Sequence, residues 1–447
     1  MNLLVLIGCV TIAFAILGFV TLIALLAMRY SHWSAEVGLP PNRYLLGLAQ
    51  RFRQWGRVLE TRFTPPSERL LTLAHGHVVS QYMMTAARLG IADAFERDAR
   101  PAAAVAEELN LHPGTVAHIL RVLAGHGCFE IVAGTEHMVR HNSVSALLRT
   151  DHPRSLRPML LMLAESYGAW DKAPQMAGSG VSVFVERSGG ETFAESRFAS
   201  AANPDERPVS GEVMLRSAEA SLFRLSEGGL LADYEWHSHG RIFDLSRSRG
   251  RFLSAILKAN KELVGVVWDT PDASVASQTW WSRFAEAVVE RVTFSSAESL
   301  GELPVLRSGD ALLLGFVLST LDDESALELL MVLRGHIGGL DVPILVVDMV
   351  LEDRESARVK LVMDAQARGL GPIRHRTQSG WQALLLKGGF AVAEVTPCRG
   401  YASVIRARPL EGVTLPTSPS EQNGEKEASG PEGKANETKP LLTPNAA

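Results

Sequence analysis

From about residue 240 onward, short β-rich segments alternate with helical segments, and this alternation restricts the possible folds more than any other property of the chain. It is typical of an α/β fold, with a mostly parallel sheet and helices on both faces. Strands are predicted at Ile242–Leu245, Val264–Trp268, Val292–Phe294, Leu312–Leu318, Ile344–Val347, Val392–Thr396 and Ala402–Ile405. Helices are predicted at Phe252–Ala259, Trp280–Val289, Glu324–Arg334 and Trp381–Leu386. The last two strands are close in sequence, so we expect an antiparallel pair.

Residues 241–251 have the outline of a strand, a ligand-cradling turn and the start of a helix. In a doubly wound sheet, a ligand lies beyond the carboxyl ends of the strands, near the switch in strand order. Glycine suits such a turn because it lets the backbone approach a ligand closely and tolerates positive φ. Here only Gly250 remains, and Ser246, Arg247 and Ser248 stand where two or three glycines are normally needed.

Two acidic residues belong to the same region of the predicted sheet. Asp244 precedes the turn, and Asp269 follows the second strand. A carboxylate at the end of that strand can accept hydrogen bonds from both hydroxyls of a ribose. Alternatively, Asp269 or Asp272 can cap the following helix. The sequence alone leaves both roles open.

The amino-terminal run from residue 3 to residue 28 contains no charged residue and is almost entirely apolar. About 20 such residues span the hydrocarbon core of a bilayer. A cleaved signal peptide is the alternative, but its apolar region is normally about 7–15 residues long and follows a basic residue. We therefore expect 1–28 to be the transmembrane anchor of a single-pass membrane protein. Arginines follow the run, and the positive-inside rule then places the bulk of the chain in the cytosol.

Residues 29–66 are predicted to form an amphipathic segment next to this anchor. Apolar residues recur at spacings of three and four between Leu45 and Phe63, with Arg51 and Arg53 among them. This periodicity predicts a helix. A basic amphipathic helix can lie on a membrane surface, or its apolar face can pack on the protein's own domain, and the sequence favours neither.

Residues 67–165 are predicted to be a compact helical domain with a winged-helix arrangement. Helices are expected at Ala74–Leu89, Ala102–Leu109 and 115–126, with a short hairpin of Phe129–Val132 and His137–Val139. DNA-binding proteins often use such units, but helix 115–126 carries one arginine and the chain has a net charge of −5. Because nucleic acids require a basic surface, we expect dimerisation or packing instead, with no nucleic acid as partner.

Composition and the positions of the cysteines give two further expectations, one for the carboxyl-terminal tail and one for metal and disulfide sites. Residues 411–447 are rich in Ser, Pro, Gly, Glu, Asn and Lys, which predicts a disordered tail because too little apolar area can be buried. Cys9, Cys128 and Cys398 lie far apart and form neither a disulfide framework nor a metal-ligand pattern. We therefore expect no bound metal.

Short stretches along the chain combine in a specific order: Gln81–Phe95, Val105–Leu109, Ile119–Ala124, Phe243–Leu245, Val267–Pro271, Ala311–Leu330, Arg376–Thr377, Trp381 and Gly388–Phe390. In this combination, residues 74–408 resemble the plant-type and bacterial small-molecule O-methyltransferase family, which includes caffeate, hydroxyindole and polyketide O-methyltransferases. The resemblance implies a winged-helix dimerisation domain in a homodimer, followed over 166–410 by a Rossmann-like class I methyltransferase domain. It also implies S-adenosyl-L-methionine (SAM) as the methyl donor.

The resemblance places the donor site at the turn after the first strand. The implied donor-binding residues are Asp244, Ser246, Ser248, Gly250, Asp269 and Glu298. The family's turn reads Asp-x-Gly-Gly-Gly-x-Gly, so the side chains at 246–248 would occupy space where the donor approaches the backbone. The family's Gly-Asp pair that contacts adenine is replaced by Ala297-Glu298.

The resemblance also identifies three positions for catalysis. The family's general base is a histidine, and Ser319 stands in its place. Serine cannot act as a base near neutral pH without a partner that takes its own proton. Asp348 matches a position that is often acidic in the family, and His375 lies near the glutamate that orients the family's histidine. His375 could itself be a base, or residues 374–376 could be a basic surface loop.

These departures determine the predicted function. A positioned base contributes about 10²–10⁴-fold in rate, and holding donor and acceptor together can correspond to effective molarities of about 10⁵–10⁸ M. Because both contributions are affected, we expect a membrane-anchored, catalytically degenerate family member that acts as a scaffold or regulatory partner. The alternative is an active SAM-dependent O-methyltransferase acting on a small hydrophobic or membrane-borne hydroxyl acceptor. A tethered transcription regulator is a third hypothesis.

Overall fold

The computed structural model of the protein describes residues 43–411 except 96–97, 136–137, 199–208, 247, 285, 297–302 and 353–357, together with scattered positions between 11 and 25. The chain divides into two compact units, Met1–Ser80 and Gln81–Ala447. The expected anchor and the expected disordered tail lie largely outside the described residues. Within the described part of the chain, no helix combines the length and the apolar character needed to cross a membrane.

The first unit contains α2 (Arg43–Phe63) and the beginning of α3 (Pro66–Arg88). Pro66 suits the first turn of a helix because the N–H that proline lacks would have no partner there. Helix α2 coincides with the predicted amphipathic segment, and its Trp55 and Phe63 side chains are 66% and 83% exposed. Exposed aromatic side chains of this kind are typical of a surface that meets an apolar partner.

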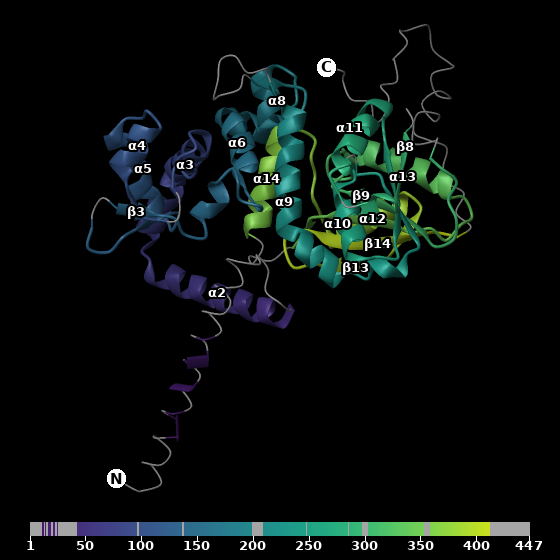
Figure 1. The fold of residues 1–447 in the computed structure, drawn as a ribbon, viewed down its shortest axis with the longest axis horizontal. Coiled ribbons are helices and arrows are strands. Elements are labelled where there is room, and N and C mark those ends of the chain that lie inside the picture. The colour runs from purple at the N-terminus through teal and green to yellow at the C-terminus, as the bar shows by residue number, and fades with distance from the viewer. Residues whose placement is uncertain are drawn as a thin grey trace. The chain divides into compact units, whose positions relative to one another are not determined.

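The second unit begins with a small helical domain (Figure 1). It comprises the end of α3, then α4 (Ala102–Glu108) and α5 (Pro113–Gly125), with three short strands. Strand β3 (Met138–Arg140) pairs antiparallel with both β1 (Arg100–Pro101) and β2 (Glu130–Ile131), so the predicted hairpin is present. Helices with a small antiparallel sheet agree with the arrangement expected for this part of the chain.

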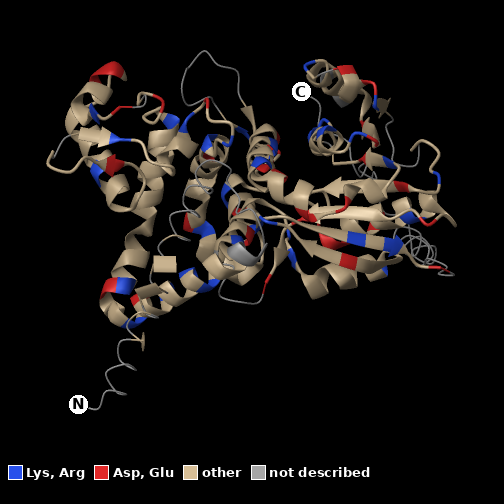
Figure 2. Cartoon of the chain, turned by 60° about the horizontal axis from the view of Figure 1, so that its bottom comes forward, with Lys and Arg blue, Asp and Glu red and all other residues tan. Residues whose placement is uncertain are grey.

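Helix α5 shows how the sequence sets this local structure. His112 Nδ1 accepts a hydrogen bond from the Thr115 N–H, and Pro113 fixes φ in the first turn. The buried side chains recur at helical spacing, namely Val116, Ile119, Leu120 and Leu123. Arg121 is the only arginine of α5, and Figure 2 shows Lys and Arg interspersed with Asp and Glu over the described elements.

Helices that the sequence pattern did not predict lie between this domain and the sheet. They are α6 (Arg157–Ser166), α7 (Ala173–Ser179), α8 (Val183–Ser188) and α9 (Gly211–Asp233), with 3₁₀ turns at Ser145–Leu148, Tyr167–Lys172 and Trp236–Ser238. The short strands β4 (Arg197–Phe198) and β5 (Val209–Ser210) form a hairpin before α9. Helix α14 (Arg358–Leu370), from much later in the chain, lies beside α8 and α9 (Figure 1).

A seven-stranded sheet forms the core of the second unit, in the order β13-β14-β10-β9-β6-β7-β8. The parallel strands are β6 (Arg241–Asp244), β7 (Val264–Asp269), β8 (Val292–Ser296), β9 (Asp310–Gly315) and β10 (Ile344–Asp348). Strand β14 (Ser403–Pro409) lies antiparallel to β10 and to β13 (Phe390–Pro397). Every predicted strand is therefore present, including the antiparallel pair. Strand order reverses between β6 and β9, which defines the switch point.

Helices cover both faces of this sheet. They are α10 (Arg251–Ala259), α11 (Pro271–Trp281), α12 (Glu286–Val289), α13 (Asp323–Ile337) and α15 (Gln378–Lys387). The prediction of a single helix over Trp280–Val289 was wrong. Helix α11 instead begins at Pro271, whose fixed φ suits a first helical turn, and ends at Trp281.

The apolar strands have two buried faces. Leu312 and Leu314 of β9 pack into a cluster with side chains of α13 and α15. Leu313, which lies between them, packs into a second cluster with side chains of α9 and α10. Successive residues of a strand point to opposite faces, so a strand buried on both sides reads as a continuous apolar run. Leu312–Leu314 therefore hold helices on both sides of the sheet.

Helix α9 approaches the backbone before β14 so closely that only glycine fits at one position. A Cβ added to Gly229 would lie 1.9 Å from the Arg399 carbonyl oxygen. We expect Gly229→Ala to lower the free energy of unfolding by at least about 2 kcal/mol, since backbone must move. Gly178→Ala in α7 is the control, because its Cβ would meet no atom within 4 Å. Equal urea midpoints for the two variants would contradict this packing.

Candidate active site

The carboxyl ends of β6, β7, β9 and β10 meet at the switch point of the sheet. Asp244, which ends β6, is 1% exposed. Its Oδ1 accepts a hydrogen bond from the Ser246 N–H at 2.9 Å, and its Oδ2 accepts one from the Leu253 N–H at 3.4 Å. Burial raises the pKa of Asp244 to about 6, although the hydrogen bonds from Ser246 and Leu253 oppose the rise. Asp244 therefore fixes the loop that follows β6 and, through Leu253, the start of helix α10.

The two serines of the turn have different surroundings. Ser246 is buried, and its Oγ accepts a hydrogen bond from the Gly315 N–H of β9 at 2.8 Å. This hydroxyl therefore joins the turn to the neighbouring strand. The Ser248 Oγ is also buried but has no hydrogen-bond partner within the described chain. An orphaned buried hydroxyl normally has a missing partner, such as a ligand or a water.

Gly250 is required by packing within the protein. Its φ is +69°, and an added Cβ would lie 2.5 Å from Val267 Cγ2 and 2.8 Å from Trp281 Nε1. The Trp281 indole N–H also donates to the Arg249 carbonyl oxygen at 3.0 Å. Gly250 thus leaves room for the Trp281 side chain of α11. Arg249, the residue before Gly250, adopts the left-handed conformation with φ +59°.

Asp269 lies at the end of β7 and is 2% exposed. Its Oδ1 accepts the Thr270 N–H at 3.0 Å, and its Oδ2 lies 3.4 Å from the Ser277 hydroxyl. Thr270, not Asp269, is the residue before the first turn of α11, and its own hydroxyl is buried without a partner in the described residues. Glu298, the remaining predicted donor residue, lies outside the described residues.

Asp348, Ser319 and His375 come together although they are far apart in sequence. Asp348 ends β10 and is fully buried, and Ser319 is 2% exposed. Burial raises the pKa of Asp348, while His375 and the Ser319 hydroxyl offset part of that rise. The three positions singled out for catalysis therefore form one cluster.

His375 is fixed by α14. Its backbone N–H donates to Asp364 Oδ1 at 3.2 Å, and its Nδ1 lies 3.3 Å from the same oxygen. Burial by itself would raise the pKa of Asp364, but contacts with His375 and Arg368 outweigh it and hold the pKa below its usual range. A carboxylate on one ring nitrogen of a histidine orients the other nitrogen.

The segment around His375 is only partly at the surface, because Arg374 is exposed whereas Arg376 is buried. The Arg374 N–H donates to the Ser319 carbonyl oxygen at 2.7 Å. Arg376 is 9% exposed, donates to the Leu318 carbonyl oxygen at 3.0 Å and pairs with Asp323 at 2.6 Å. These contacts hold His375 next to the end of β9.

Sequence reasoning missed an ion pair on α9 that lies between the two groups of carboxylates. Arg216 and Glu219 are 3.2 Å apart, and their side chains remain 34% and 26% exposed. Burial raises the pKa of Glu219 against the opposing effect of Arg216, and the charge of Asp348 adds to the rise. Arg216 in turn interacts with Asp269. The only signal in the sequence was an i, i+3 charge pair within a helix that was not predicted.

The arrangement as a whole is an α/β domain with polar groups at the carboxyl ends of parallel strands, preceded by a helical domain. Two family models match the chain, the O-methyltransferase dimerisation domain over residues 71–151 and the O-methyltransferase domain over residues 191–391. Together the matches cover well over half of the chain. The protein therefore belongs to the O-methyltransferase family whose members carry an N-terminal dimerisation domain.

Individual relatives agree with this assignment. The phenazine O-methyltransferase PhzM of Lysobacter antibioticus is 27% identical over 349 residues, which cover 77% of this chain and 97% of the relative. The acetylserotonin O-methyltransferase of Mus musculus molossinus is 27% identical over 370 residues, which cover 79% of this chain and 91% of that protein. The crystal structure of LaPhzM superposes with a TM-score of 0.65 at 25% identity, covering 78% of this chain and 100% of that one.

The raised pKa of Glu219 predicts a pH effect on stability. Above the ordinary value of 4.5 and up to the raised pKa, the folded chain keeps a proton that the unfolded chain loses, so stability falls as pH rises through this window. Glu219→Gln should therefore flatten the fall in urea midpoint between pH 4.5 and neutral pH. Glu262→Gln, at an exposed glutamate, should leave the slope as in the parent. If both variants show the same slope of urea midpoint against pH, protonation of Glu219 does not contribute to the pH dependence of stability.

Proposed function

We propose that the protein is an active SAM-dependent methyltransferase that acts on a hydroxyl group of a small hydrophobic acceptor. The observation that carries the proposal is the gathering of Asp269, Asp348, His375 and the Arg216–Glu219 pair at the carboxyl ends of the strands. The Arg241–Asp310 ion pair, in contrast, lies at the opposite ends of the strands. Perturbed carboxylates at a sheet switch point are typical of a functional site.

The residues of the turn fit a polar donor. Asp269 occupies the strand end at which a carboxylate can accept hydrogen bonds from ribose hydroxyls. The buried hydroxyls of Ser248 and Thr270 lack partners in the described residues, as expected of groups that meet a polar ligand. Ser246 does not compete for that space with its hydroxyl, because the hydroxyl is bonded to Gly315 of β9. Bound SAM supplies an electrophilic methyl group at this place.

On the acceptor side, the chain must take a proton from the attacking hydroxyl. Ser319 cannot do so near neutral pH. His375 can, at Nε2, because Nδ1 faces Asp364 and that carboxylate stabilises the imidazolium that forms. The buried Asp348 carboxyl lies close to His375 on the same side. The histidine that the family places after β9 is thus replaced by one from the segment before β12 (Arg376–Thr377), which pairs with β11 (Val350–Leu351).

The names of the relatives support an aromatic acceptor. They include methyltransferases of phenazine, acetylserotonin and isoflavone. The apolar cluster around Met162, Phe184 and Trp170 supplies the apolar surroundings that such an acceptor needs. We propose that the apolar run from residue 3 to residue 28 tethers the enzyme to a membrane in which such acceptors dissolve, and that the dimerisation domain forms a homodimer.

We further propose a division of the chain into an anchor (1–28), a juxtamembrane segment (29–66), a dimerisation domain (67–165), a methyltransferase domain (166–410) and a disordered tail (411–447). The two family matches, at 71–151 and 191–391, fall inside the third and fourth parts.

A catalytically degenerate scaffold is the second candidate function. It is favoured by Ser319 at the family's histidine position and by side chains in the donor turn. The two candidates differ in whether the chain binds the donor. A non-catalytic scaffold has no need to retain donor affinity, whereas an enzyme does.

Donor binding decides between the two candidates. Calorimetry of the full-length chain with S-adenosylhomocysteine should give a Kd below about 100 μM, or about −5.5 kcal/mol. Asp269→Asn should weaken binding by about tenfold or more through the lost charge-assisted hydrogen bonds to ribose. Asp98→Asn, at an exposed residue of the helical domain, should bind as the parent does. Absence of heat at millimolar ligand would establish the scaffold function instead.

Turnover tests the proposed base. His375→Gln should reduce methyl transfer to a panel of phenols by about 10²–10⁴-fold and leave the affinity for S-adenosylhomocysteine unchanged. His237→Gln, at an exposed histidine, serves as the control. Methyl transfer by His375→Gln at the parent rate would assign the base to another residue.

A further inference from the structure

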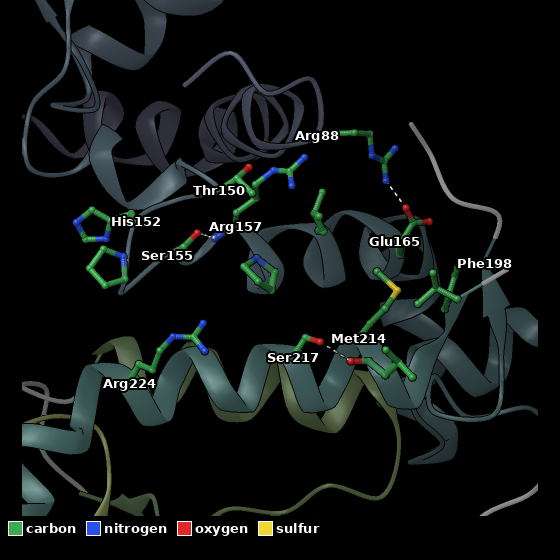
Figure 3. Close-up of a pocket in the computed structure, with 15 residues that line it drawn as sticks. Arg88, Thr150, His152, Ser155, Arg157, Glu165, Phe198, Met214, Ser217 and Arg224 are labelled. Carbon is green, nitrogen blue, oxygen red and sulfur yellow. Dashed lines mark hydrogen bonds and ion pairs between the residues drawn. The ribbon is translucent and has the colours of Figure 1, made fainter. Parts of the chain in front are cut away.

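A cavity of about 510 Å³ lies between α6 and α9 (Figure 3). Val213, Ser217 and Arg224 of α9 line it, at spacings that place them on one helical face. Arg216 and Glu219 belong to a different face of the same helix. Met214 and Phe198, which also line the cavity, belong to the apolar cluster of Met162, Phe184 and Trp170, so the cavity adjoins the region proposed for the acceptor.

Two arginines face this cavity without forming an ion pair with a carboxylate of the described residues. Arg157 of α6 donates to the Ala87 carbonyl oxygen at 2.7 Å, and Arg224 donates to the Ser221 hydroxyl at 2.9 Å. No carboxylate of the described residues lies within ion-pair distance of either guanidinium. Arg88, on the same cavity, differs because Glu165 neutralises it. A half-buried pair of cations without ion-pair partners in the described residues favours an anion between them.

Neutral polar groups add to this end. Ser155 and His152 line the cavity beside Arg157, and so does Thr150, whose hydroxyl donates to Asp93 Oδ2 at 2.8 Å. The Nδ1 of His152 accepts the Arg154 N–H at 3.1 Å, which leaves Nε2 as the nitrogen that carries the hydrogen. Burial lowers the pKa of Arg224, and the nearby Glu227 opposes the shift. The guanidinium of Arg224 is thus poorly solvated, and an anion would stabilise it.

The other end of the cavity is apolar except for the Arg88–Glu165 ion pair (Figure 3). Met214 and Phe198 lie there, away from Arg224 and His152 (Figure 3). Leu161, Val209 and Val213 extend the same lining. A cavity with one cationic and one apolar end matches a ligand with a charged head and an apolar body.

We propose that this cavity binds an amphiphile that carries one terminal anion, a carboxylate or a phosphate, on an apolar body. Arg157 and Arg224 hold the anion from opposite walls, because a guanidinium pairs in bidentate fashion with both groups. Met214 and Phe198 enclose the apolar body. The volume lies within the usual range of about 300–1,000 Å³ for small-ligand pockets. The anionic end of this site rests on Arg157 and Arg224 alone, whereas its apolar end shares Met214 and Phe198 with the cluster proposed for the acceptor.

The test is calorimetry of the full-length chain with decanoate, decyl phosphate and 1-decanol. Decanoate or decyl phosphate should bind at least about tenfold more tightly than 1-decanol, and the tighter of the two identifies the head group. Arg224→Gln and Arg157→Gln should each weaken that binding by about tenfold or more. Arg283→Gln, at an exposed arginine outside the cavity, should not change it. Arg224→Lys should retain part of the affinity, which separates lost charge from misfolding.

Location is tested by filling the cavity. Val213→Trp, at a position that is 56% exposed, should abolish binding of the anionic probe and leave the affinity for S-adenosylhomocysteine as in the parent. Val275→Trp, at a 67% exposed valine of α11, should leave both unchanged. Equal binding of decanoate, decyl phosphate and 1-decanol would overturn the proposal. The proposal would also be overturned if the Arg224→Gln and Val213→Trp variants bound the anions as tightly as the parent does. Absence of binding at millimolar probe would overturn it as well.

Discussion

The hydrogen bonds of the buried Asp244 carboxylate hold together the part of the molecule on which the site depends. Asp244 accepts N–H groups from the turn and from α10, and the Ser246 hydroxyl then accepts the N–H of Gly315. Strands β6 and β9, on either side of the switch point, are thereby joined through side chains of the turn. A glycine-rich turn has no such side chains and leaves this space open. The turn of this protein is consequently fixed by its own residues before any ligand arrives.

This arrangement changes how the missing glycines are understood. From the sequence, side chains at 246–248 stand where a donor would approach the backbone. In the structure, the Ser246 hydroxyl is used between two strands, whereas the Ser248 hydroxyl is buried and has no partner in the described residues. One substitution therefore contributes to the sheet, and the other adds a polar group of the kind that a ligand can satisfy. Substituted glycines are thus compatible with a polar ligand and do not by themselves imply an inert protein.

The sequence predicted the sheet well because strands buried on both faces read as apolar runs, as Leu312–Leu314 do. It predicted the helices near α11 less well, since Pro271 starts that helix earlier than the apolar periodicity indicated. It did not predict α9, whose 23 residues mix small, apolar and charged side chains on several faces. The Arg216–Glu219 pair was missed for the same reason. Its importance depends on Asp269 and Asp348, which only the fold brings near it.

Helix α9 connects these findings. One face packs Phe223 on Phe252 of α10, with ring centroids 4.2 Å apart, and so lies against the helix that follows the donor turn. The pair Arg216–Glu219 is presented toward the carboxylates of β7 and β10, while Arg224 faces away from them. Because Gly229 fits against the Arg399 backbone without room for a Cβ, α9 cannot shift along its axis without a clash. The position of α9 is therefore set by the sheet.

Charge is distributed unevenly around this helix. On the sheet side, Asp269, Asp348 and Glu219 outnumber Arg216, and burial raises the pKa of both Asp348 and Glu219. On the opposite side, Arg157 and Arg224 have no carboxylate partner in the described residues and favour an anion. A single helix thus has acidic groups with raised pKa values on one side and two arginines without an ion-pair partner in the described residues on the other.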